Sequence, residues 1–374
     1  MLSRIHYAKP SITEREVSYA TDAARNGWAE NCYGYINKFQ DLLKNYLGVP
    51  HVIATSSCTG ALHMALAALD VGPGDEVIVP DITWMASAAP ITYLGATPVF
   101  VDVLADTWCI DPAAIAKAIT KKTKAIIVVH LYGNLCEMDE IMALGHQHGI
   151  PVLEDAAEAL GSSYKGKKAG SIGDMATFSF HGTKTVTTGE GGALIVRSDA
   201  IYNKLLVLES HGRDPKVPKQ FWCEKIGFKY KMSNIEAAIG TAQMERIDEL
   251  VARKRDIFKE YARQLGPING LHFNPERLGT YNSYWMSTIV FDPSIPFVRD
   301  ELLAEFKKNN IDARVFFYPV SMMPPFKERR ENKVSYSIYE RGINLPSYHD
   351  LTQDEITRVC QVIKGYLQKT TGTK

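Results

Sequence analysis

The sequence predicts an α/β fold in which helices cover a mostly parallel sheet of seven strands. Short β-rich runs alternate along the chain with stretches that have apolar residues at helical spacing. Several of these runs are apolar throughout rather than alternating, which is typical of strands buried on both faces of a parallel sheet. The predicted strands span residues 51–55, 75–80, 97–103, 125–132, 150–156, 175–180 and 192–198.

Two segments between these strands have the pattern of amphipathic crossover helices. Residues 60–70 place apolar side chains at helical spacing. The segment 111–120 begins with Asp111, which is suited to the N-cap of a helix, and continues with Pro112, which is favoured at the first helical position. We therefore expect both segments to connect strands of the sheet.

The chain changes character after about residue 245. A charged helical pattern is followed by a strand-like run, a helix-like segment and a closing helix, at residues 244–265, 284–292, 299–310 and 354–369. We expect a large domain over residues 1–245 and a smaller C-terminal α+β domain over residues 246–374.

The composition favours a small-molecule ligand over a macromolecular or membrane partner. Lysine and arginine together number 42, as do aspartate and glutamate, and no basic block stands out. The six cysteines form no CxxC pair and have no zinc-like spacing to histidine, which predicts no metal site, no disulfide and a reducing compartment. The N-terminus lacks the apolar segment of a signal peptide, and no run is long enough to span a bilayer, so we expect a cytoplasmic protein.

Polar residues follow three of the predicted strands, at the edge where open α/β sheets bind ligands. Asp155 ends one strand, and Ser57 and Thr59 follow another at the start of a helix. Lys184 comes just after the strand that ends near Ser179, and a glycine-rich segment separates it from the next apolar run. This pattern indicates that Lys184 is carried into the interior.

An amine, a carboxylate and a hydroxyl-rich helix N-terminus together meet the needs of pyridoxal phosphate (PLP). The Lys184 amine can form a Schiff base with the PLP aldehyde, and the Asp155 carboxylate can keep the pyridine nitrogen protonated, which makes the ring an electron sink. Backbone N–H groups at a helix start suit the phosphate. Trp84, just after a strand, can stack on the ring.

Each of these residues also has an ordinary structural interpretation. Lys184 taken alone would more often be a solvated loop residue, because lysine is seldom fully buried. Asp155 and the hydroxyl residues can cap helices or turns, and Trp84 can belong to the core. An NAD-binding domain is excluded because SSCTG, not GxGxxG, follows the first strand. The coincidence of all these residues at one edge of the sheet favours PLP.

A series of motifs extends over nearly the whole chain: GWAENCYGYINKFQ, SSCTGALHMAL, GDEVIVPDITW, GATPVFVDV, HLYGN, EDAAEALGS, FSFHGTKTVTTGEGG and RGINLPSYHDLTQDEI. In this order they resemble the fold-type I PLP-dependent sugar aminotransferases of the DegT/StrS group. The resemblance implies that Lys184 holds PLP as an internal aldimine and acts as general acid and base, while Asp155 pairs with the pyridine nitrogen. The resemblance also implies that Glu158 would lie near the cofactor's 3-hydroxyl group, that Trp84 would stack on the ring, and that Thr59 and Ser179 would hold the phosphate. Ser57 and Cys58, next to Thr59, complete the expected cofactor-binding residues.

Three positions bear on how far the resemblance extends. Relatives that remove a sugar hydroxyl group have histidine where this chain has Lys184, so the lysine implies transamination. Lys229 stands where relatives usually have an asparagine that reaches across a homodimer to the partner's PLP phosphate, and we expect Lys229 to meet that phosphate as a point charge. Cys58 stands where glycine is common. The resemblance implies a homodimer whose subunits complete each other's active sites.

The resemblance also implies the two substrates. L-Glutamate donates its amino group and converts PLP to pyridoxamine phosphate (PMP), which then aminates a nucleotide-linked ketosugar. Motifs such as HLYGN, FFYPVSMMPPF and RGINLPSY look most like perosamine synthases, which favours amination of GDP-4-keto-6-deoxymannose at C4 for a surface polysaccharide such as the lipopolysaccharide O-antigen.

Two alternatives to this substrate stay open. The acceptor can be a UDP- or dTDP-linked 3- or 4-ketosugar, because the loops that recognise sugars vary within the group. Tyr318, Ser321 and Met322 occupy the place of a histidine-containing substrate loop, and His181 replaces an aromatic residue of perosamine-type sequences. The remote alternative is a catalytically silent, ligand-sensing member, which would have lost the lysine or the aspartate; both are present.

Overall fold

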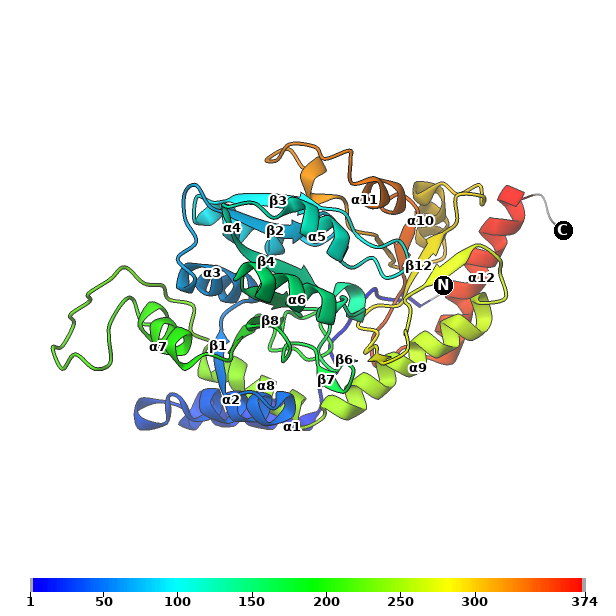
Figure 1. The fold of residues 1–374 in the computed structure, drawn as a ribbon. Helices are drawn as coiled ribbons and strands as arrows, with labels where there is room; N and C mark the ends of the chain where they lie inside the picture. The colour runs from blue at the N-terminus through cyan, green and yellow to red at the C-terminus, as the bar shows by residue number, and fades with distance from the viewer. Residues whose placement is uncertain (1–2, 372–374) are drawn as a thin grey trace.

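The computed structural model describes residues 3–371 and contains the predicted seven-stranded, mostly parallel sheet (Figure 1). The strand order is β1-β9-β8-β5-β4-β2-β3. Neighbouring strands are parallel except at β9, which runs antiparallel to both β1 and β8. The strands are β1 (His51–Thr55), β2 (Glu76–Pro80), β3 (Thr97–Val101), β4 (Thr123–Val129), β5 (Val152–Asp155), β8 (Met175–Ser179) and β9 (Gly192–Val196).

Several strands end earlier than predicted, and β3 and β4 show why. After β3, Val103 pairs with Ile110 in an isolated bridge instead of continuing along the sheet. After β4, residues Leu131–Gly133 form a 3-10 turn in which Tyr132 has a φ of 54°. Residues 103, 110 and 131–133 are buried although they lie outside the sheet. The apolar runs therefore predicted burial correctly, but they located the ends of the strands only approximately.

Helices pack against the large sheet. α3 starts two residues before the predicted position because the Ser57 hydroxyl group accepts the N–H of Gly60 at 3.0 Å and caps the helix. Asp111 caps α5 as predicted. Figure 1 shows α1, α2 and α8 side by side below β1. The helices of this region are α1 (Glu14–Asn26), α2 (Gly34–Leu47), α3 (Cys58–Ala68), α4 (Ala89–Tyr93), α5 (Pro112–Ala118), α6 (Met138–His148), α7 (Asp199–Leu208) and α8 (Asn234–Met244), with 3-10 turns at Ala29–Asn31 and Met85–Ser87.

The C-terminal part contains a second, antiparallel sheet in the order β10-β12-β14-β13, packed with helices around its own apolar core. Ile5, from the other end of the chain, is fully buried in this core and pairs with Ile311. The domain boundary between residues 245 and 246 stays a prediction. The elements are α9 (Ile247–Leu265), β10 (Leu271–Phe273), β12 (Thr288–Phe291), α10 (Arg299–Lys308), β13 (Arg314–Val315), a 3-10 turn (Val320–Met322), α11 (Lys333–Ile338), β14 (Gly342–Asn344) and α12 (Gln353–Thr371).

A small third sheet connects the two parts of the chain. In it β11 pairs with β6, and β6 pairs with β7. These strands are β6 (Ser163–Tyr164), β7 (Lys167–Lys168) and β11 (Thr280–Tyr281). Because β11 follows α9 and the other two strands follow β5, this sheet joins the C-terminal part to the large sheet.

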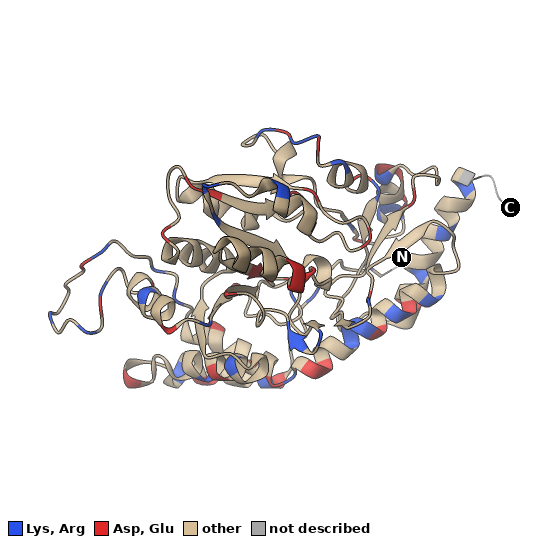
Figure 2. Cartoon of the chain, viewed as in Figure 1, with Lys and Arg blue, Asp and Glu red and all other residues tan. Residues whose placement is uncertain are grey.

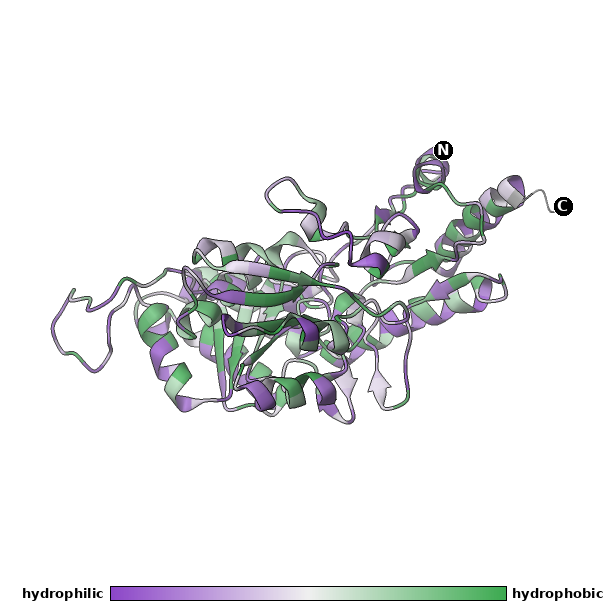
Figure 3. Cartoon of the chain, turned by 45° about the horizontal axis from the view of Figure 1, so that its top comes forward, coloured by the Kyte–Doolittle hydropathy of each residue, from purple (hydrophilic) through white to green (hydrophobic). Residues whose placement is uncertain are grey.

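Charged residues of both signs are mixed along α9 (Figure 2), whereas the strands of the large sheet are mainly hydrophobic (Figure 3). Within residues 3–371, no helix is both long enough and apolar enough to cross a membrane.

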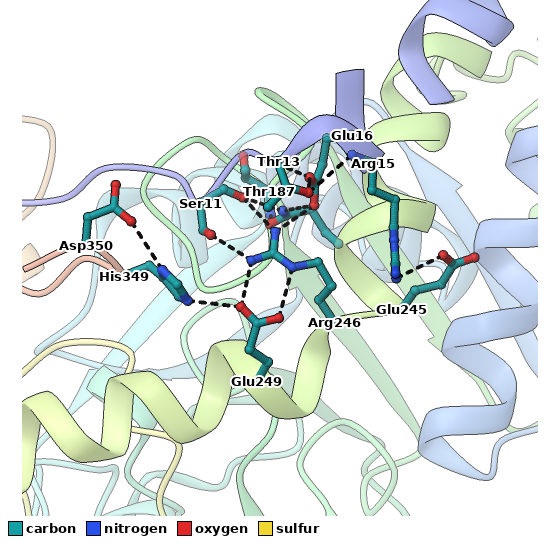
Figure 4. Close-up of polar contacts among 11 residues, drawn as sticks. Ser11, Thr13, Arg15, Glu16, Thr187, Glu245, Arg246, Glu249, His349 and Asp350 are labelled. Atoms are coloured by element: carbon teal, nitrogen blue, oxygen red, sulfur yellow. Dashed lines mark hydrogen bonds and ion pairs between the residues drawn. The ribbon is translucent and has the colours of Figure 1, made fainter. Parts of the chain in front are cut away.

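A buried ion pair fixes α1 to the junction between α8 and α9 (Figure 4). Arg246 lies 3.0 Å from Glu16, and their side chains are 8% and 1% exposed. Burial raises the pKa of Glu16, but hydrogen bonds from Thr13 and Gln243 outweigh it and bring the pKa to about 2. Gln243 also accepts the N–H of Thr187 at 3.4 Å, so the cluster supports the loop between β8 and β9.

Replacing Arg246 with methionine should lower the free energy of unfolding by about 3 kcal/mol, because Glu16 would lose its cation in a buried site. Urea unfolding followed by circular dichroism measures this loss. Arg15→Met is the matched control, since Arg15 pairs with Glu245 at 3.4 Å with a side chain that is 47% exposed, and its loss should stay below about 1 kcal/mol. Equal losses in the two variants would contradict the assignment.

Candidate active site

A cavity of about 680 Å³ lies beside the carboxyl ends of β5 and β8 and the start of α3. Its walls come from the large sheet, from the N-terminal residue Tyr7 and from C-terminal residues around β13 and β14. Of the residues that the sequence predicted for the site, those lining this cavity are Ser57, Cys58, Thr59, Trp84, Asp155, Glu158, Ser179 and Lys184. Lys229 is exposed and lies outside the cavity of its own chain.

Lys184 is carried inward by the loop between β8 and β9. Its side chain is only 14% exposed, and its amine lies 3.4 Å from Oε1 of Glu158. The amine also lies 3.8 Å from the centre of the Trp285 ring, a favourable position for a cation. The indole N–H of Trp285 donates to the carbonyl group of Thr183 at 2.8 Å, which fixes the ring against the loop. The amine therefore faces the cavity with a carboxylate and an aromatic face as neighbours.

Asp155 ends β5 and points toward the same space. The Ser87 hydroxyl group donates to Oδ2 at 2.7 Å, and the N–H of Ala157 donates to Oδ1 at 3.2 Å. Burial raises the pKa of Asp155, while the hydrogen bond from Ser87 and the charge of Lys184 act in the opposite direction. The carboxylate is thus held in one orientation inside a poorly solvated site, where a cationic partner would stabilise its charged form.

The neighbouring Glu154 has a purely internal role. Successive side chains of a strand point to opposite faces, so Glu154 points away from Asp155. It accepts hydrogen bonds from His130 at 2.8 Å and from the N–H groups of Gly170, Ile172 and Gly173. Burial raises its pKa, but these hydrogen bonds outweigh burial and lower the pKa below its usual value. Of the two carboxylates, only Asp155 is available to a ligand.

Glu158 is oriented by the turn that follows β4. Tyr132 donates its N–H to Oε2 of Glu158 at 2.9 Å, and its left-handed backbone together with Gly133 (φ 94°) allows this close turn. Burial raises the pKa of Glu158, and the charge of Lys184 opposes the increase. The Glu158 carboxyl group is therefore held close to the Lys184 amine.

The start of α3 also lines the cavity. The first N–H groups of a helix have no partner within the helix, and Ser57 satisfies only that of Gly60. Cys58 and Thr59 are the first two residues of the helix, so their N–H groups are free, and both residues line the cavity. The backbone of Gly192 in β9 comes so close that an added Cβ atom would lie 2.5 Å from the nitrogen of Cys58. Glycine is thus required where β9 passes the helix start.

Sequence reasoning missed several cavity residues. Trp285 lies within the strand-like run predicted over residues 284–292, three residues before β12 begins, and carried no separate signal. Ser87 lies at the end of the 3-10 turn that follows Trp84. Tyr7, Arg314 and Asn344 come from segments remote in sequence, and only the folded chain brings them together. The indole of Trp84 is 59% exposed and lies 6.2 Å from the Phe317 ring, so it forms the open side of the cavity.

Residues 10–364 match the model of the DegT/DnrJ/EryC1/StrS aminotransferase family. Over 369 residues the chain is 40% identical to the GDP-perosamine synthase of Caulobacter vibrioides, and the match covers 98% of this chain and 99% of the relative. The GDP-perosamine synthase of Vibrio cholerae is 38% identical, with 96% and 98% covered.

Solved structures show the same architecture. A Streptococcus pneumoniae protein assigned to the sugar aminotransferases superimposes in its PMP form with a TM-score of 0.92 at 29% identity, and 99% of both chains is covered. The PLP form of that protein gives the same TM-score. The 3-amino-5-hydroxybenzoic acid synthase superimposes with a TM-score of 0.90 at 27% identity, covering 98% of this chain and all of the other.

The described residues fit PLP. The cavity offers one amine, one oriented carboxylate without an internal role, and free N–H groups at a helix start, which match the aldehyde, the pyridine nitrogen and the phosphate of the cofactor. Gly192 gives independent support, because the absence of a side chain at this residue leaves the start of α3 accessible. PLP alone therefore provides a partner for the amine, the carboxylate and the free N–H groups.

Gly192→Ala should raise the dissociation constant for PLP by at least about tenfold, the factor that corresponds to losing one hydrogen bond to a charged group. The new methyl group would push the Cys58 and Ser57 backbone out of place. Titration of the apoprotein with PLP measures this effect. Gly182→Ala is the control, since the nearest atom to its added Cβ is 3.7 Å away. Unchanged affinity in Gly192→Ala would refute the phosphate site.

Proposed function

The chain belongs to the DegT/DnrJ/EryC1/StrS aminotransferase family, and from this membership we propose that it transfers the amino group of L-glutamate to C4 of GDP-4-keto-6-deoxymannose. The enzyme is a PLP-dependent sugar aminotransferase. The substrate proposal rests on the near full-length similarity to two GDP-perosamine synthases, together with the Lys184 amine and the Asp155 carboxylate in one cavity. We place the protein in the cytoplasm, in the same compartment as nucleotide-linked sugars.

We assign roles to the residues as follows. When bound, PLP would supply an acceptor for the amino group and an electron sink for the carbon that loses its proton. Lys184 would hold the cofactor, and its Nζ would take up and return that proton. Asp155 would keep the pyridine nitrogen protonated. Glu158 would hold the amine of Lys184 and the 3-hydroxyl group of the cofactor in their relative positions. Trp84 would lie along one face of the ring and exclude water.

The phosphate of the cofactor is assigned to the start of α3. The N–H groups of Cys58 and Thr59 would donate to its oxygens, and the hydroxyl groups of Ser57, Thr59 and Ser179 would add further contacts. Cys58 suits this site because burial raises its pKa well above the usual range, so its thiol stays neutral beside the phosphate.

The substrate assignment is tested with a panel of GDP-, UDP- and dTDP-linked 3- and 4-ketosugars at fixed L-glutamate. The proposal predicts that kcat/KM is highest for GDP-4-keto-6-deoxymannose and that the product carries its amine at C4, as determined by nuclear magnetic resonance. A preference for a UDP- or dTDP-linked sugar would keep the aminotransferase and replace the acceptor. Coenzyme binding without turnover of any donor would instead support a silent family member.

We further propose that the enzyme is a homodimer in which Lys229 reaches the cofactor phosphate of the partner subunit. Lys229 lies on the segment between α7 and α8 that extends from the body at the left of Figure 1. This segment also exposes Phe221 (85%) and Ile226 (93%), and exposed apolar side chains of this size mark interaction surfaces. Trp84, half-exposed in the cavity, would be covered by the partner.

A heterodimer that joins a Lys184→Ala subunit to a Lys229→Ala subunit tests this arrangement. Each homodimer should be impaired at both sites, the first in proton transfer and the second in PLP binding. The heterodimer, purified through two different tags, should recover about half the activity of the wild-type dimer, because one of its two sites is complete.

Recovery of activity to no more than the level of the Lys229→Ala homodimer would show that Lys229 does not act across the interface. Lys219→Ala serves as the control, since Lys219 lies on the same segment and contacts the Trp222 ring of its own chain. Its heterodimer with Lys184→Ala should behave like one made with a wild-type subunit.

A further inference from the structure

Asp81, at the end of β2, is a fully buried carboxylate that accepts three hydrogen bonds from the C-terminal part of the chain. Ser321 donates its N–H to Oδ1 and its hydroxyl group to Oδ2, both at 2.8 Å. The Asn332 side chain donates to Oδ2, also at 2.8 Å. These donors offset the cost of burying the carboxyl group, whose pKa burial raises.

The segment that Asp81 holds forms one wall of the cavity. Phe317, Tyr318 and Met323 line the cavity on either side of Ser321. The backbone is fastened at the same place, because Val320 donates its N–H to the carbonyl group of Asp81 at 2.7 Å. We call residues 317–323 the wall segment.

Residues that follow Asp81 form another part of the cavity lining. Thr83, Trp84 and Ser87 all line the cavity, and Ser87 donates to Asp155. The centres of the Trp84 and Phe317 rings lie 6.2 Å apart. Asp81 therefore connects two parts of the cavity lining that are some 240 residues apart in sequence.

We infer that Asp81 is a positioning residue for the ketosugar substrate: it holds the wall segment at the distance from Trp84 that the acceptor requires, without contacting the substrate. This inference rests on the proposed function. The amine of Lys184 and the carboxyl groups of Asp155 and Glu158 have hydrogen bonds of their own that do not involve Asp81. The half-reaction with L-glutamate should consequently be less dependent on Asp81 than binding of the bulky nucleotide sugar.

Asp102 offers a matched control. It lies beyond the end of the neighbouring strand β3 and accepts hydrogen bonds from the N–H groups of Val334 and Ser335 at 2.9 and 2.8 Å, and from the Ser335 hydroxyl group at 2.7 Å. It thus fastens α11, as Asp81 fastens the wall segment. Neither Asp102 nor its partners line the cavity.

The test compares Asp81→Asn, Ser321→Ala and Asp102→Asn with the wild type. Stopped-flow absorbance measures the half-reaction with L-glutamate, and steady-state assays measure KM for the ketosugar. Asp81→Asn and Ser321→Ala should raise that KM by about tenfold or more, the factor expected for losing one hydrogen bond to a charged group. The glutamate half-reaction should stay within about twofold in all variants, and Asp102→Asn should leave the KM unchanged.

Hydrogen–deuterium exchange supplies a readout that does not depend on turnover. In Asp81→Asn the backbone N–H groups of the wall segment should exchange faster, whereas in Asp102→Asn the increase should be confined to the start of α11. A ketosugar KM unchanged in Asp81→Asn, or an equal loss in both half-reactions, would overturn the inference. A failure of the proposed function differs from a failure of this inference, because the wild type itself would then not turn over the GDP-linked sugar. In that case the KM is measured with the acceptor that the wild type does use.

Discussion

The buried contact between the amine of Lys184 and the carboxyl group of Glu158, at 3.4 Å, is the interaction on which the site depends. An amine costs free energy to bury unless a charge or an aromatic face compensates for lost water, and here Glu158 and Trp285 do so together. Burial raises the pKa of both Asp155 and Glu158, and the charge of Lys184 lowers them again. Both carboxyl groups therefore respond to the charge of Lys184.

The rigid fold keeps these groups in place. Asp155 ends a central strand, Glu158 is turned by the N–H of Tyr132, and the start of α3 faces the cavity because Gly192 lets β9 pass at backbone distance. None of these elements forms the site alone. One C-terminal segment that lines the cavity is fastened to the end of β2, so the cavity depends on contacts between the two parts of the chain.

Much of this arrangement could be predicted from the sequence because its signals are local. Buried parallel strands are apolar throughout, and Asp155 and Lys184 follow such strands directly. Glu158 was predicted only through the family resemblance, since a glutamate in a turn carries no signal of its own. Tyr7 and Arg314 reach the cavity through contacts between distant segments, which periodicity does not encode. The role proposed for Lys229 depends on a second subunit, which a single chain does not contain.

The most direct test of the account is the absorption spectrum of the purified, PLP-loaded protein, recorded before and after L-glutamate and again after GDP-4-keto-6-deoxymannose. The account predicts a visible band from lysine-bound PLP that is replaced by the PMP spectrum on addition of glutamate and returns on addition of the sugar. Lys184→Ala should lack that band from the outset. A wild-type protein that takes up PLP without developing the band would contradict the central role of Lys184.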